Sequence, residues 1–585
     1  MGEEIFYNMD TMKTLPERMG QMEPSWLGHY EAGVPLSLEV PPLTLPGILA
    51  KTAARFPKRS ATIFLGGHLS YAALDAQVNR FATALLKAGL QPGERVAICL
   101  PNCPQFIVGL YGAWRAGAVA VPLNPLYKEE ELATALQHTG ARTILTLTKF
   151  YPTLAGIGQR LSLERTILTS VADYLPLIPR TLFNLFRAKP EGHAYPARNP
   201  TTKGVVSYGS FLRQGRSLSP GVEIHPEDLA LLQHTGGTTG HPKAARLTQQ
   251  NLVANLLQGA SFIPGIRSGE EVFAAPTPFF HVLGLTAALN LPIYLGASIL
   301  PFPRFNAREV LEGIVRHRAT IFIGVPAMFV AMGHLRTLNQ ADLTAMRFFI
   351  SGAAPLPPEV KHRFEETSGA RIVEGYGLTE ASPTTHLNPV YGTQKTGSIG
   401  LPLPGTEAKI VSLDDPAREV APGTEGELLV RGPQVMEGYW NDPQATDGVL
   451  QDGWLATGDI ATADGDGYFY IVDRKKDLVI VGGYNVYPRE IEDFLYQHPS
   501  VKEAAAFGVP HPLRGEVLAA CIVLKDGATS TPAEIIRHCR ENLPSHKVPR
   551  RLEFVAEIPK TLVGKPLRRA LREREAMRDT KEKVT

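Results

Sequence analysis

Short apolar runs alternate with amphipathic windows along most of the chain from about residue 45. An apolar run at 95–100 is followed by a window with helical periodicity at 104–117 and by a second apolar run at 118–124. Strand, helix and strand at this spacing predict a parallel sheet covered by helices. Similar runs return at 143–148, 298–303, 320–326 and 347–356. We therefore predict an α/β fold with a doubly wound core.

The pattern changes after about residue 390. Short strands broken by Gly and Pro predict a small antiparallel or barrel-like unit, and the highly charged segment 485–585 predicts a small α+β domain. We therefore divide the chain into a large N-terminal domain, 1–475, in which 390–475 is the barrel-like subdomain, and a small C-terminal α+β domain, 476–585.

Composition narrows the class of protein. A chain of 585 residues exceeds one ordinary core, and 59 basic against 57 acidic side chains give no electrostatic argument for a nucleic-acid partner. Four cysteines without a CxxC pair favour a reducing compartment, and the acidic N-terminus does not resemble a secretory signal. The uncharged stretch 272–303 is interrupted by prolines, so we expect buried strands and helices there. We expect a cytoplasmic globular protein.

Residues 170–188, SVADYLPLIPRTLFNLFRA, depart from the α/β rhythm. Large apolar residues alternate here with Arg180 and Arg187. Two interpretations remain open: a helix packed on the main domain, or a peripheral helix that lies in a membrane interface.

The segment 234–248, HTGGTTGHPKAARLT, is typical of a phosphate-binding loop. Glycines allow backbone N–H groups to approach phosphate oxygens, threonine hydroxyls add donors, and Lys243 adds a charge. A Walker A loop requires lysine directly after the second glycine, followed by Ser or Thr, whereas His241 and Pro242 intervene here and Ala244 follows. The segment therefore argues for a nucleotide but against a conventional P-loop NTPase.

Further motifs follow in a fixed order. They are PFFHVLG (278–284), SGAAPL (351–356), EGYGLTE (374–380), GELLVRGPQVMEGYWNDPQAT (426–446), GWLATGDI…YPREIE (453–492) and IPKTLVGKPLRR (558–569). Together with the glycine-threonine loop they resemble the adenylate-forming superfamily of acyl-CoA synthetases, luciferases and peptide-synthetase adenylation domains. The resemblance covers about 45–572. The insertion at 170–183, the linker at 473–488 and the C-terminal motif are most similar to bacterial long-chain fatty-acid:CoA ligases.

The resemblance implies an ATP site, a Mg²⁺ ion and coenzyme A as a substrate. The β- and γ-phosphates would be held by Thr235, Gly236, Gly237, Thr238, Thr239, Gly240 and Lys243. Tyr376 would lie against adenine and Thr379 would reach the α-phosphate. Glu380, with Thr235, would hold Mg²⁺, which prefers oxygen ligands. The adenine slot would be completed by Gly352, Ala353, Glu374 and Gly375.

The C-terminal third would supply the remaining groups. Asp459 resembles the family's ribose clamp, assisted by Arg474. Lys565 would bridge the substrate carboxylate and the α-phosphate during adenylation. The small domain would then swing about a hinge at Lys476, so that Gly482 and Gly483 give pantetheine room for the second step.

The apolar part of the site is less defined. The family's FFH motif places His281 as a gate where the acyl group and AMP meet, although a histidine in an apolar run also suits an ordinary core position. An acyl pocket would be lined by Phe280, Val282, Leu283, Leu285 and Leu289.

We predict an ATP-dependent long-chain fatty acid:CoA ligase that acts on a fatty acid, ATP and CoA, in the cytoplasm or peripherally at the inner face of the membrane. The alternatives are a ligase for medium-chain or aryl acids, a non-catalytic acyl or acyl-CoA binding protein on the same scaffold, and a luciferase-like oxygenase. Oligomeric state is not defined by the sequence.

Overall fold

The computed structural model describes residues 24–195, 204–235, 243–482, 484–511, 515–560 and 566–584. It divides into two compact units. Unit 1 comprises 1–407 and 431–453, and unit 2 comprises 408–430 and 454–585. The segments directly before and after Lys476 therefore belong to the same compact unit, unit 2. The domain boundary expected at 475/476 stays a prediction.

One sheet of unit 1 has its strands in the order β19-β9-β8-β4-β3-β5-β6-β7. The strands are β3 (Arg95–Cys99), β4 (Val119–Pro122), β5 (Thr143–Leu147), β6 (Arg165–Thr169), β7 (Val205–Ser207), β8 (Leu229–His234), β9 (Ala244–Thr248) and β19 (Gly438–Tyr439). Strands β3 to β8 pair in parallel, whereas β9 is antiparallel to β8 and to β19. Residues 143–147 of β5 are all buried, as expected for a parallel strand covered on both faces.

The second sheet of unit 1 runs in the order β16-β15-β14-β13-β12-β10-β11-β1-β2. The strands are β1 (Ser60–Phe64), β2 (Gly67–Ser70), β10 (Val272–Ala275), β11 (Ser298–Pro301), β12 (Ile321–Gly324), β13 (Phe348–Ser351), β14 (Arg371–Gly377), β15 (Thr384–Leu387) and β16 (Leu401–Pro402). The centre from β14 to β1 is parallel and the edges are antiparallel. These sheets confirm the α/β fold class.

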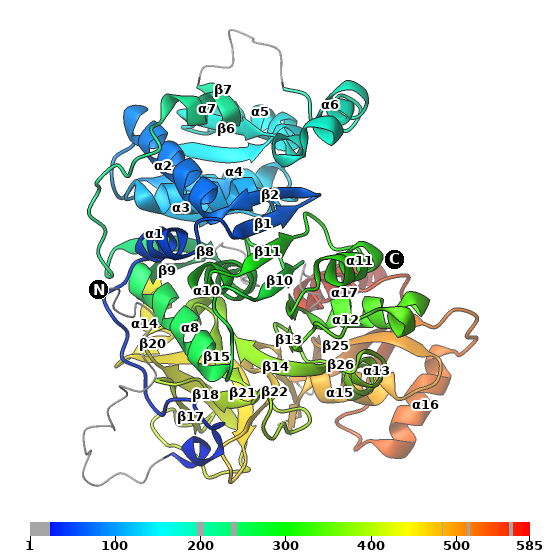
Figure 1. Ribbon diagram of the computed structural model, residues 1–585. Coiled ribbons are helices and arrows are strands. Elements are labelled where there is room, and N and C mark those ends of the chain that lie inside the picture. Colours follow the sequence, from blue (N-terminus) through cyan, green and yellow to red (C-terminus); the bar gives the residue numbers. More distant parts are fainter. Residues whose placement is uncertain are drawn as a thin grey trace. The chain divides into compact units, whose positions relative to one another are not determined.

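Helices connect the strands of unit 1 (Figure 1). They are α1 (Leu45–Arg55), α2 (Tyr71–Lys87), α3 (Pro104–Arg115), α4 (Glu129–Thr139), α5 (Tyr151–Ile157), α6 (Leu177–Phe186), α7 (Tyr208–Gln214), α8 (Gln249–Phe262), α9 (Val282–Leu285), α10 (Leu291–Leu295), α11 (Ala307–His317), α12 (Pro326–Gly333), α13 (Pro358–Ser368) and α14 (Pro443–Asp447), with the short strand β20 (Leu450–Gln451). Local chemistry sets their ends. The Ser70 hydroxyl accepts the Ala73 N–H at the start of α2, and α4 ends at Gly140, whose φ of 65° is left-handed.

Unit 2 begins with an antiparallel sheet that contains β17 (Glu407–Val411), β18 (Gly426–Arg431), β21 (Trp454–Ala463) and β22 (Phe469–Arg474). Strand β18 pairs with β21, and β21 pairs with β22. The sequence predicted an antiparallel or barrel-like unit in this region, and the sheet is antiparallel.

The C-terminal part of unit 2 is an α+β layer, as predicted. Its sheet has the order β24-β23-β26-β25, with β27 on β26. Its elements are β23 (Val479–Val481), β24 (Tyr484–Val486), α15 (Pro488–Tyr496), β25 (Val501–His511), β26 (Gly515–Leu524), α16 (Pro532–Asn542), β27 (Arg551–Phe554) and α17 (Arg568–Val584). Alternation along β25 places Ala504 and Ala506 in the core that holds α15 and α16, and Phe507 in the core that holds Leu571 of α17.

Within the residues that the structure describes, no helix is both long and apolar enough to cross a bilayer. The apolar stretch 272–303 instead forms β10, α9, α10 and β11, and most of its side chains are buried. This confirms the expected core placement.

Candidate active site

The predicted phosphate loop connects two antiparallel strands. Strand β8 ends at His234 and β9 begins at Ala244, and the Thr235 N–H donates to the Lys243 carbonyl at 2.9 Å. A Walker A loop instead joins a strand to a helix, so this topology agrees with the argument against a P-loop NTPase. The predicted ligands Gly236, Gly237, Thr238, Thr239 and Gly240 lie outside the described residues.

Lys243 and Glu380 meet on opposite parts of one tyrosine. The Lys243 Nζ lies 4.9 Å from the centroid of the Tyr439 ring, within the range of a cation–π contact. The Tyr439 hydroxyl donates to Glu380 Oε1 at 2.8 Å. Burial, and secondarily the Glu380 carboxylate, raise the pKa of Tyr439 well above its usual value, so the hydroxyl stays protonated and remains a donor.

Sheet pairing explains why Tyr439 is in this position. Strand β19 pairs antiparallel with β9, and Tyr439 lies opposite Ala245. The Met436 N–H donates to the Glu380 carbonyl at 2.8 Å and fixes the backbone of Glu380 beside the same segment. Glu380 and Thr379 form the short helix η8 (Thr379–Ala381), which follows β14.

Tyr376 extends from the carboxyl end of β14 directly before η8. It lies opposite His386 of β15, and the two rings meet edge to face at 6.0 Å between centroids. His386 is buried, and burial lowers its pKa to about 3, so the ring is neutral. Tyr376 is half-buried.

The proposed adenine-slot residues lie at the carboxyl ends of β13 and β14. Ser351 is in register with Glu374, so Gly352 and Gly375 follow at the same sheet edge. A Cβ added at Gly352 would be 3.4 Å from the nearest atom, Leu283 Cδ2, which is an ordinary contact. A β-carbon at this position would therefore pack in ordinary contact with Leu283 and with the Gly375 carbonyl.

Ala353 and Glu374 are held in specific ways. Ala353 has φ of 70°, in the left-handed region that costs a non-glycine residue about 1–2 kcal/mol. Glu374 Oε1 lies 3.6 Å from the Lys361 Nζ of α13. Strained backbone of this type is often found at ligand sites, which agrees with the predicted role of this turn.

His281 marks the start of α9 and connects the two sheets. Its Nδ1 accepts the Leu283 N–H at 3.4 Å, and the ring is half-buried. The preceding Phe280 carbonyl accepts the side-chain amide of Gln233, in β8, at 3.0 Å. The Thr286 hydroxyl donates to the Ser382 carbonyl, directly after η8, at 2.7 Å.

Contacts within unit 1 therefore form a closed circuit. From β8 the circuit passes through the segment 280–283 to Gly352, along β14 to Glu380, through Tyr439 to Lys243, and back across the β8–β9 hairpin. The nucleotide-site residues predicted in this unit, apart from those outside the described residues, border one region.

Asp459 and Arg474 form a pair in unit 2. They are directly opposite each other on β21 and β22, and the Arg474 Nε lies 3.3 Å from Asp459 Oδ1. The Asp459 N–H donates to the Thr457 hydroxyl, which itself donates to the Leu428 carbonyl. The structure thus brings together the two residues that the sequence predicted as a ribose clamp and its assistant.

The predicted hinge and C-terminal residues are partly described. Lys476 is exposed in η9 (Lys475–Asp477), and the adjacent Asp477 Oδ2 lies 3.1 Å from the Arg568 Nη1 of α17. Gly482 has φ of 58° at the turn between β23 and β24. Gly483 and Lys565 lie outside the described residues.

Metal-ligating side chains do not cluster in the described part of the chain: no group of three or more His, Cys, Asp or Glu there is arranged to hold a metal ion. A single carboxylate such as Glu380 nevertheless suits Mg²⁺ that arrives with a triphosphate, since Mg²⁺ usually keeps several waters and takes one or two carboxylates plus phosphate oxygens.

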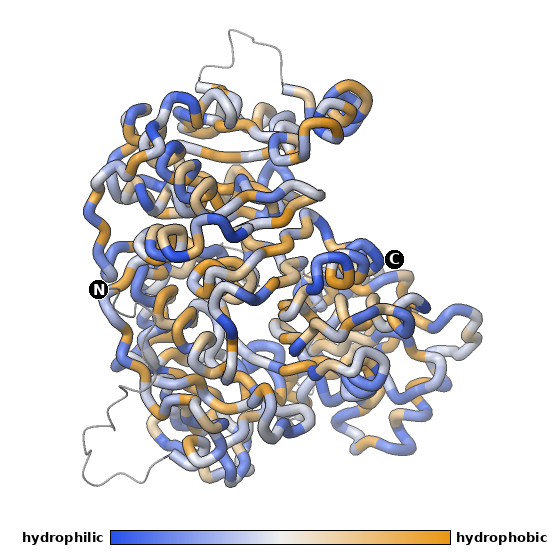
Figure 2. The backbone as a smooth tube through the Cα atoms, viewed as in Figure 1, coloured by the Kyte–Doolittle hydropathy of each residue, from blue (hydrophilic) through white to orange (hydrophobic). Residues whose placement is uncertain are grey.

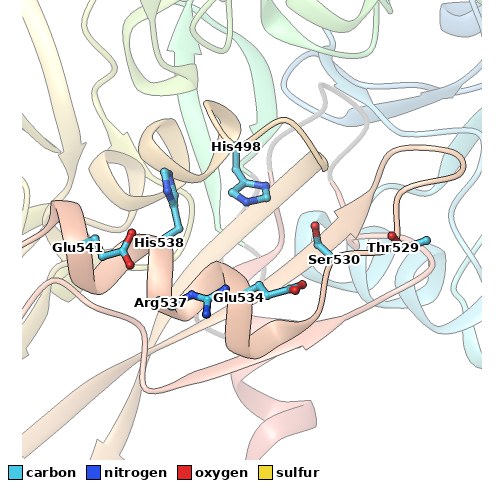
Figure 3. A pocket seen from close by; sticks show the side chains of 7 residues that line it. All are labelled: His498, Thr529, Ser530, Glu534, Arg537, His538 and Glu541. Carbon is cyan, nitrogen blue, oxygen red and sulfur yellow. The ribbon is translucent and has the colours of Figure 1, made fainter.

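A separate polar cavity of about 390 Å³ lies in unit 2 beside α16 (Figure 3). It is lined by His498, Thr529, Ser530, Glu534, Arg537, His538 and Glu541. Glu534 caps the helix by accepting the Thr531 N–H at 2.7 Å. The cavity contains none of the predicted site residues.

Tyr439 contacts two predicted site residues, although the sequence alone assigns no role to it. It lies within the motif 426–446, one of those that resemble the adenylate-forming superfamily. Its contacts with Lys243 and Glu380 depend on the pairing of β19 with β9, which periodicity does not define.

Comparisons with known proteins identify related chains and a related fold. A family model described as AMP-binding enzyme matches residues 49–440, and a model for the AMP-binding enzyme C-terminal domain matches 490–565. The chain is 42% identical over 557 residues to a long-chain-fatty-acid–CoA ligase of Bacillus subtilis, covering 95% of this chain and 99% of that protein. It is 39% identical to a protein of the same name from Escherichia coli O157:H7, covering 94% and 98%. The solved structure of the anthranilate CoA ligase AuaEII with anthranoyl-AMP aligns with TM-score 0.80 and 28% identity, covering 93% and 99%.

Proposed function

This chain belongs to the AMP-binding enzyme family, and we propose that it ligates a long-chain fatty acid to coenzyme A with ATP. The fatty carboxylate attacks the α-phosphorus of ATP, which forms acyl-AMP and releases pyrophosphate. The CoA thiol then attacks the acyl carbonyl, and AMP leaves. The observation that carries this proposal is the joint contact of Lys243 and Glu380 with Tyr439, beside Tyr376 and Gly352.

The opposite charges beside Tyr439 suit a nucleotide triphosphate. Lys243 offsets negative charge on the β- and γ-phosphates, together with Thr235, Gly236, Gly237, Thr238, Thr239 and Gly240. Thr379 binds the α-phosphate at the start of η8. Charge on the equatorial and leaving oxygens increases during displacement at phosphorus, so preorganised donors and cations lower the barrier.

Glu380 is proposed to hold Mg²⁺ together with Thr235. These residues would hold an ion that, when bound, would neutralise negative charge on the phosphates. The Tyr439 hydroxyl fixes one oxygen of Glu380 in place, which orients the carboxylate before ATP binds.

The adenine and the ribose of ATP are assigned to separate sets of residues. Tyr376 lies against adenine in a slot bordered by Gly352, Ala353, Glu374 and Gly375. Asp459 accepts the ribose hydroxyls while Arg474 keeps its carboxylate oriented. A carboxylate can accept hydrogen bonds from both ribose hydroxyls.

Two half-reactions require two arrangements of the C-terminal segment. Lys565 contacts the substrate carboxylate and α-phosphate during adenylation. Motion about Lys476 then replaces Lys565 with Gly482 and Gly483, which leave room for pantetheine. The exposed position of the Lys476 side chain agrees with a hinge there.

The acyl group is assigned to the segment that follows β10. His281 is assigned as the gate between acyl group and AMP. The following residues Val282, Leu283, Leu285 and Leu289 are buried. Each methylene buried contributes about 0.8 kcal/mol, so the depth of an apolar pocket sets chain-length preference.

A second candidate substrate class is an aryl carboxylic acid. The structural similarity to an anthranilate CoA ligase favours it. The two candidates share every step of the chemistry and differ in the acyl pocket.

An acid panel tests the proposal. Protein, ATP, Mg²⁺ and CoA are mixed with octanoate, palmitate, oleate, benzoate or anthranilate, and both pyrophosphate and acyl-CoA are measured. The highest kcat/KM is expected with palmitate or oleate. Preference for benzoate or anthranilate supports the aryl candidate, and silence with every acid supports an acyl-binding protein without turnover.

We place the enzyme in the cytoplasm, where ATP and CoA are available and where its four cysteines stay reduced. These cysteines are Cys99, Cys103, Cys521 and Cys539, and all four are buried free thiols. A peripheral position at the inner face of the membrane agrees with the surface of α6.

A further inference from the structure

Helix α6 exposes an unusual number of large apolar side chains. Five of its ten residues are large, apolar and more than half exposed: Leu177 (81%), Ile178 (74%), Leu182 (52%), Leu185 (70%) and Phe186 (70%). None of the residues of α6, all of which the structure describes, is buried. Clusters of exposed apolar residues on a protein surface indicate a site of contact with a partner or a membrane.

The exposed residues share one face of the helix. At 100° per residue, Leu177, Ile178, Leu182, Leu185 and Phe186 fall within one half of the helix circumference. Phe183 lies outside this half and packs against the His193 ring, with 5.6 Å between centroids. Because the contact between Phe183 and His193 attaches α6 to unit 1, the apolar face of α6 points away from the rest of unit 1.

The position of α6 leaves this face accessible. Helix α6 lies at the outer edge of unit 1 beyond α5 (Figure 1), and apolar and polar residues alternate along it (Figure 2). It packs against the short helix η5 (Val171–Tyr174).

The charges of this segment favour an anionic surface. Helix α6 contains Arg180 and no acidic residue, and Arg187 and Lys189 follow it. All three are exposed. Arg187 pairs with Glu191 at 3.2 Å in an exposed ion pair, which contributes little. Arg180 lies 3.9 Å from the half-buried carboxylate of Asp173.

The size of the face argues against a second copy of the chain as the occupant. A ten-residue helix is about 15 Å long and about 10 Å wide. Its single face is small beside the roughly 800 Å² per partner that a stable protein interface buries. A bilayer surface, in contrast, accepts one short apolar face with adjacent cations.

We propose that the apolar face of α6, formed by Leu177, Ile178, Leu182, Leu185 and Phe186, inserts into the interface of an anionic phospholipid bilayer. The inference deepens the proposed function, on which it rests, because a long-chain fatty acid partitions into bilayers and α6 brings the enzyme to that source of substrate. The occupant is the lipid surface itself.

Vesicle flotation of the full-length protein tests the proposal. The double variant Leu177→Asn, Leu185→Asn is compared with the matched variant Leu126→Asn, Leu218→Asn, which changes two leucines exposed elsewhere. With mixed phosphatidylcholine and phosphatidylglycerol vesicles, the α6 variant is expected to lose about tenfold or more in partition coefficient. The matched variant should partition like the wild type. Equal partitioning of all three proteins overturns the proposal.

Two further measurements separate the alternatives. Changing both Arg187 and Lys189 to Gln is expected to weaken binding to anionic vesicles by about thirtyfold, at about 1 kcal/mol for each of the two cations. Weak binding to pure phosphatidylcholine should be unchanged. If sedimentation velocity instead shows a dimer that the Leu177→Asn, Leu185→Asn variant dissociates, the face is a protein interface and the membrane proposal is wrong.

Activity with octanoate in the absence of vesicles distinguishes this inference from the proposed function. Wild type and α6 variant are expected to have equal kcat/KM with octanoate, because α6 contributes no residue to the described active-site circuit. Equal activity also shows that the variant is folded. Loss of vesicle binding with octanoate turnover intact supports the inference, whereas a wild type that binds vesicles but activates no acid contradicts only the proposed function.

Discussion

The hydroxyl of Tyr439 donates a 2.8 Å hydrogen bond to the carboxylate of Glu380. The ring of the same tyrosine faces the ammonium of Lys243 at 4.9 Å. One side chain therefore sets the positions of a cation and an anion that come from segments far apart in the sequence. This arrangement preorganises the proposed phosphate and Mg²⁺ ligands before ATP arrives, which reduces the cost of ordering them during the reaction.

Tyr439→Phe removes the hydrogen bond but retains the ring under Lys243. We expect the concentration of Mg²⁺ needed for half-maximal activity to rise and kcat/KM for ATP to fall by about tenfold, since a hydrogen bond to a charged group contributes about 1.5–3 kcal/mol. Pyrophosphate release at varied Mg²⁺ measures both effects.

Tyr470→Phe is the matched control for this variant. The Tyr470 hydroxyl also donates to a carboxylate, Asp464 Oδ2 at 3.1 Å, but within the antiparallel sheet of unit 2. Its Mg²⁺ dependence should match that of the wild type. An unchanged Mg²⁺ dependence in Tyr439→Phe would argue against Glu380 as a metal ligand.

Arg474→Ala tests the ribose assignment. Loss of the 3.3 Å contact leaves Asp459 without the cation that orients its carboxylate, so KM for ATP should rise by about tenfold. The free energy of unfolding should change by less than about 1 kcal/mol, since the Arg474 side chain is 39% exposed and such pairs contribute little.

The neighbouring residue provides the control for Arg474. Lys475 pairs with Glu427 Oε2 at 2.7 Å, so Lys475→Ala removes a comparable ion pair from the next position of the chain. KM for ATP should remain at the wild-type value in this variant. Equal KM values in the two variants would mean that the sheet, and not the ribose contact, is what Arg474 supports.

Much of this fold could be predicted from the sequence because its strands are buried on both faces. The run at 95–100 became β3 (Arg95–Cys99), and the run at 143–148 became β5 (Thr143–Leu147). A parallel strand that is buried on both faces requires a continuous apolar run, and such a run is visible in a short stretch of sequence. Helix α17 lies in the predicted α+β domain but has no apolar periodicity to mark it, because charged residues surround the buried Leu571.

Site residues could be predicted where they belong to a recognisable sequence motif. They could not be predicted where their contacts depend on the pairing of strands. Asp459 and Arg474 each belong to a quoted motif, and the structure brings them together. Tyr439 gains its contacts only when β19 pairs with β9, and such a long-range register leaves no periodic signal in one sequence. The direction in which a side chain points toward a ligand likewise leaves no periodic signal in one sequence.

His386 predicts a pH dependence of stability. Its folded pKa is lowered to about 3, whereas an unfolded histidine titrates near 6.5. Between these values the unfolded state binds the additional proton, so the stability that neutral His386 permits is present above about pH 6.5 and decreases as pH falls. From pH 7.5 to 5, this group should reduce the free energy of unfolding by about 2 kcal/mol.

Urea unfolding at pH 7.5 and pH 5 measures this contribution. His386→Gln should show a smaller decrease than the wild type, because the buried group no longer titrates. His362→Gln is the control, since His362 is exposed on α13 and its removal should leave the wild-type decrease unchanged. A decrease in His386→Gln as large as in the wild type would contradict the assignment.

Lys565→Ala separates the two half-reactions. Adenylation requires a cation at the carboxylate and α-phosphate, so pyrophosphate release should fall by about a hundredfold or more, the usual cost of removing a group that stabilises developing charge. Conversion of supplied acyl-AMP to acyl-CoA should remain within a few-fold of the wild type, because the proposed hinge motion at Lys476 would remove Lys565 from the second step. Lys560→Ala is the matched control, since Lys560 pairs with Glu503 at 2.8 Å at the base of the same segment and should affect neither step. If both half-reactions fall equally in Lys565→Ala, one arrangement of the C-terminal segment must serve both, and the assignment of Lys476 as a hinge is wrong.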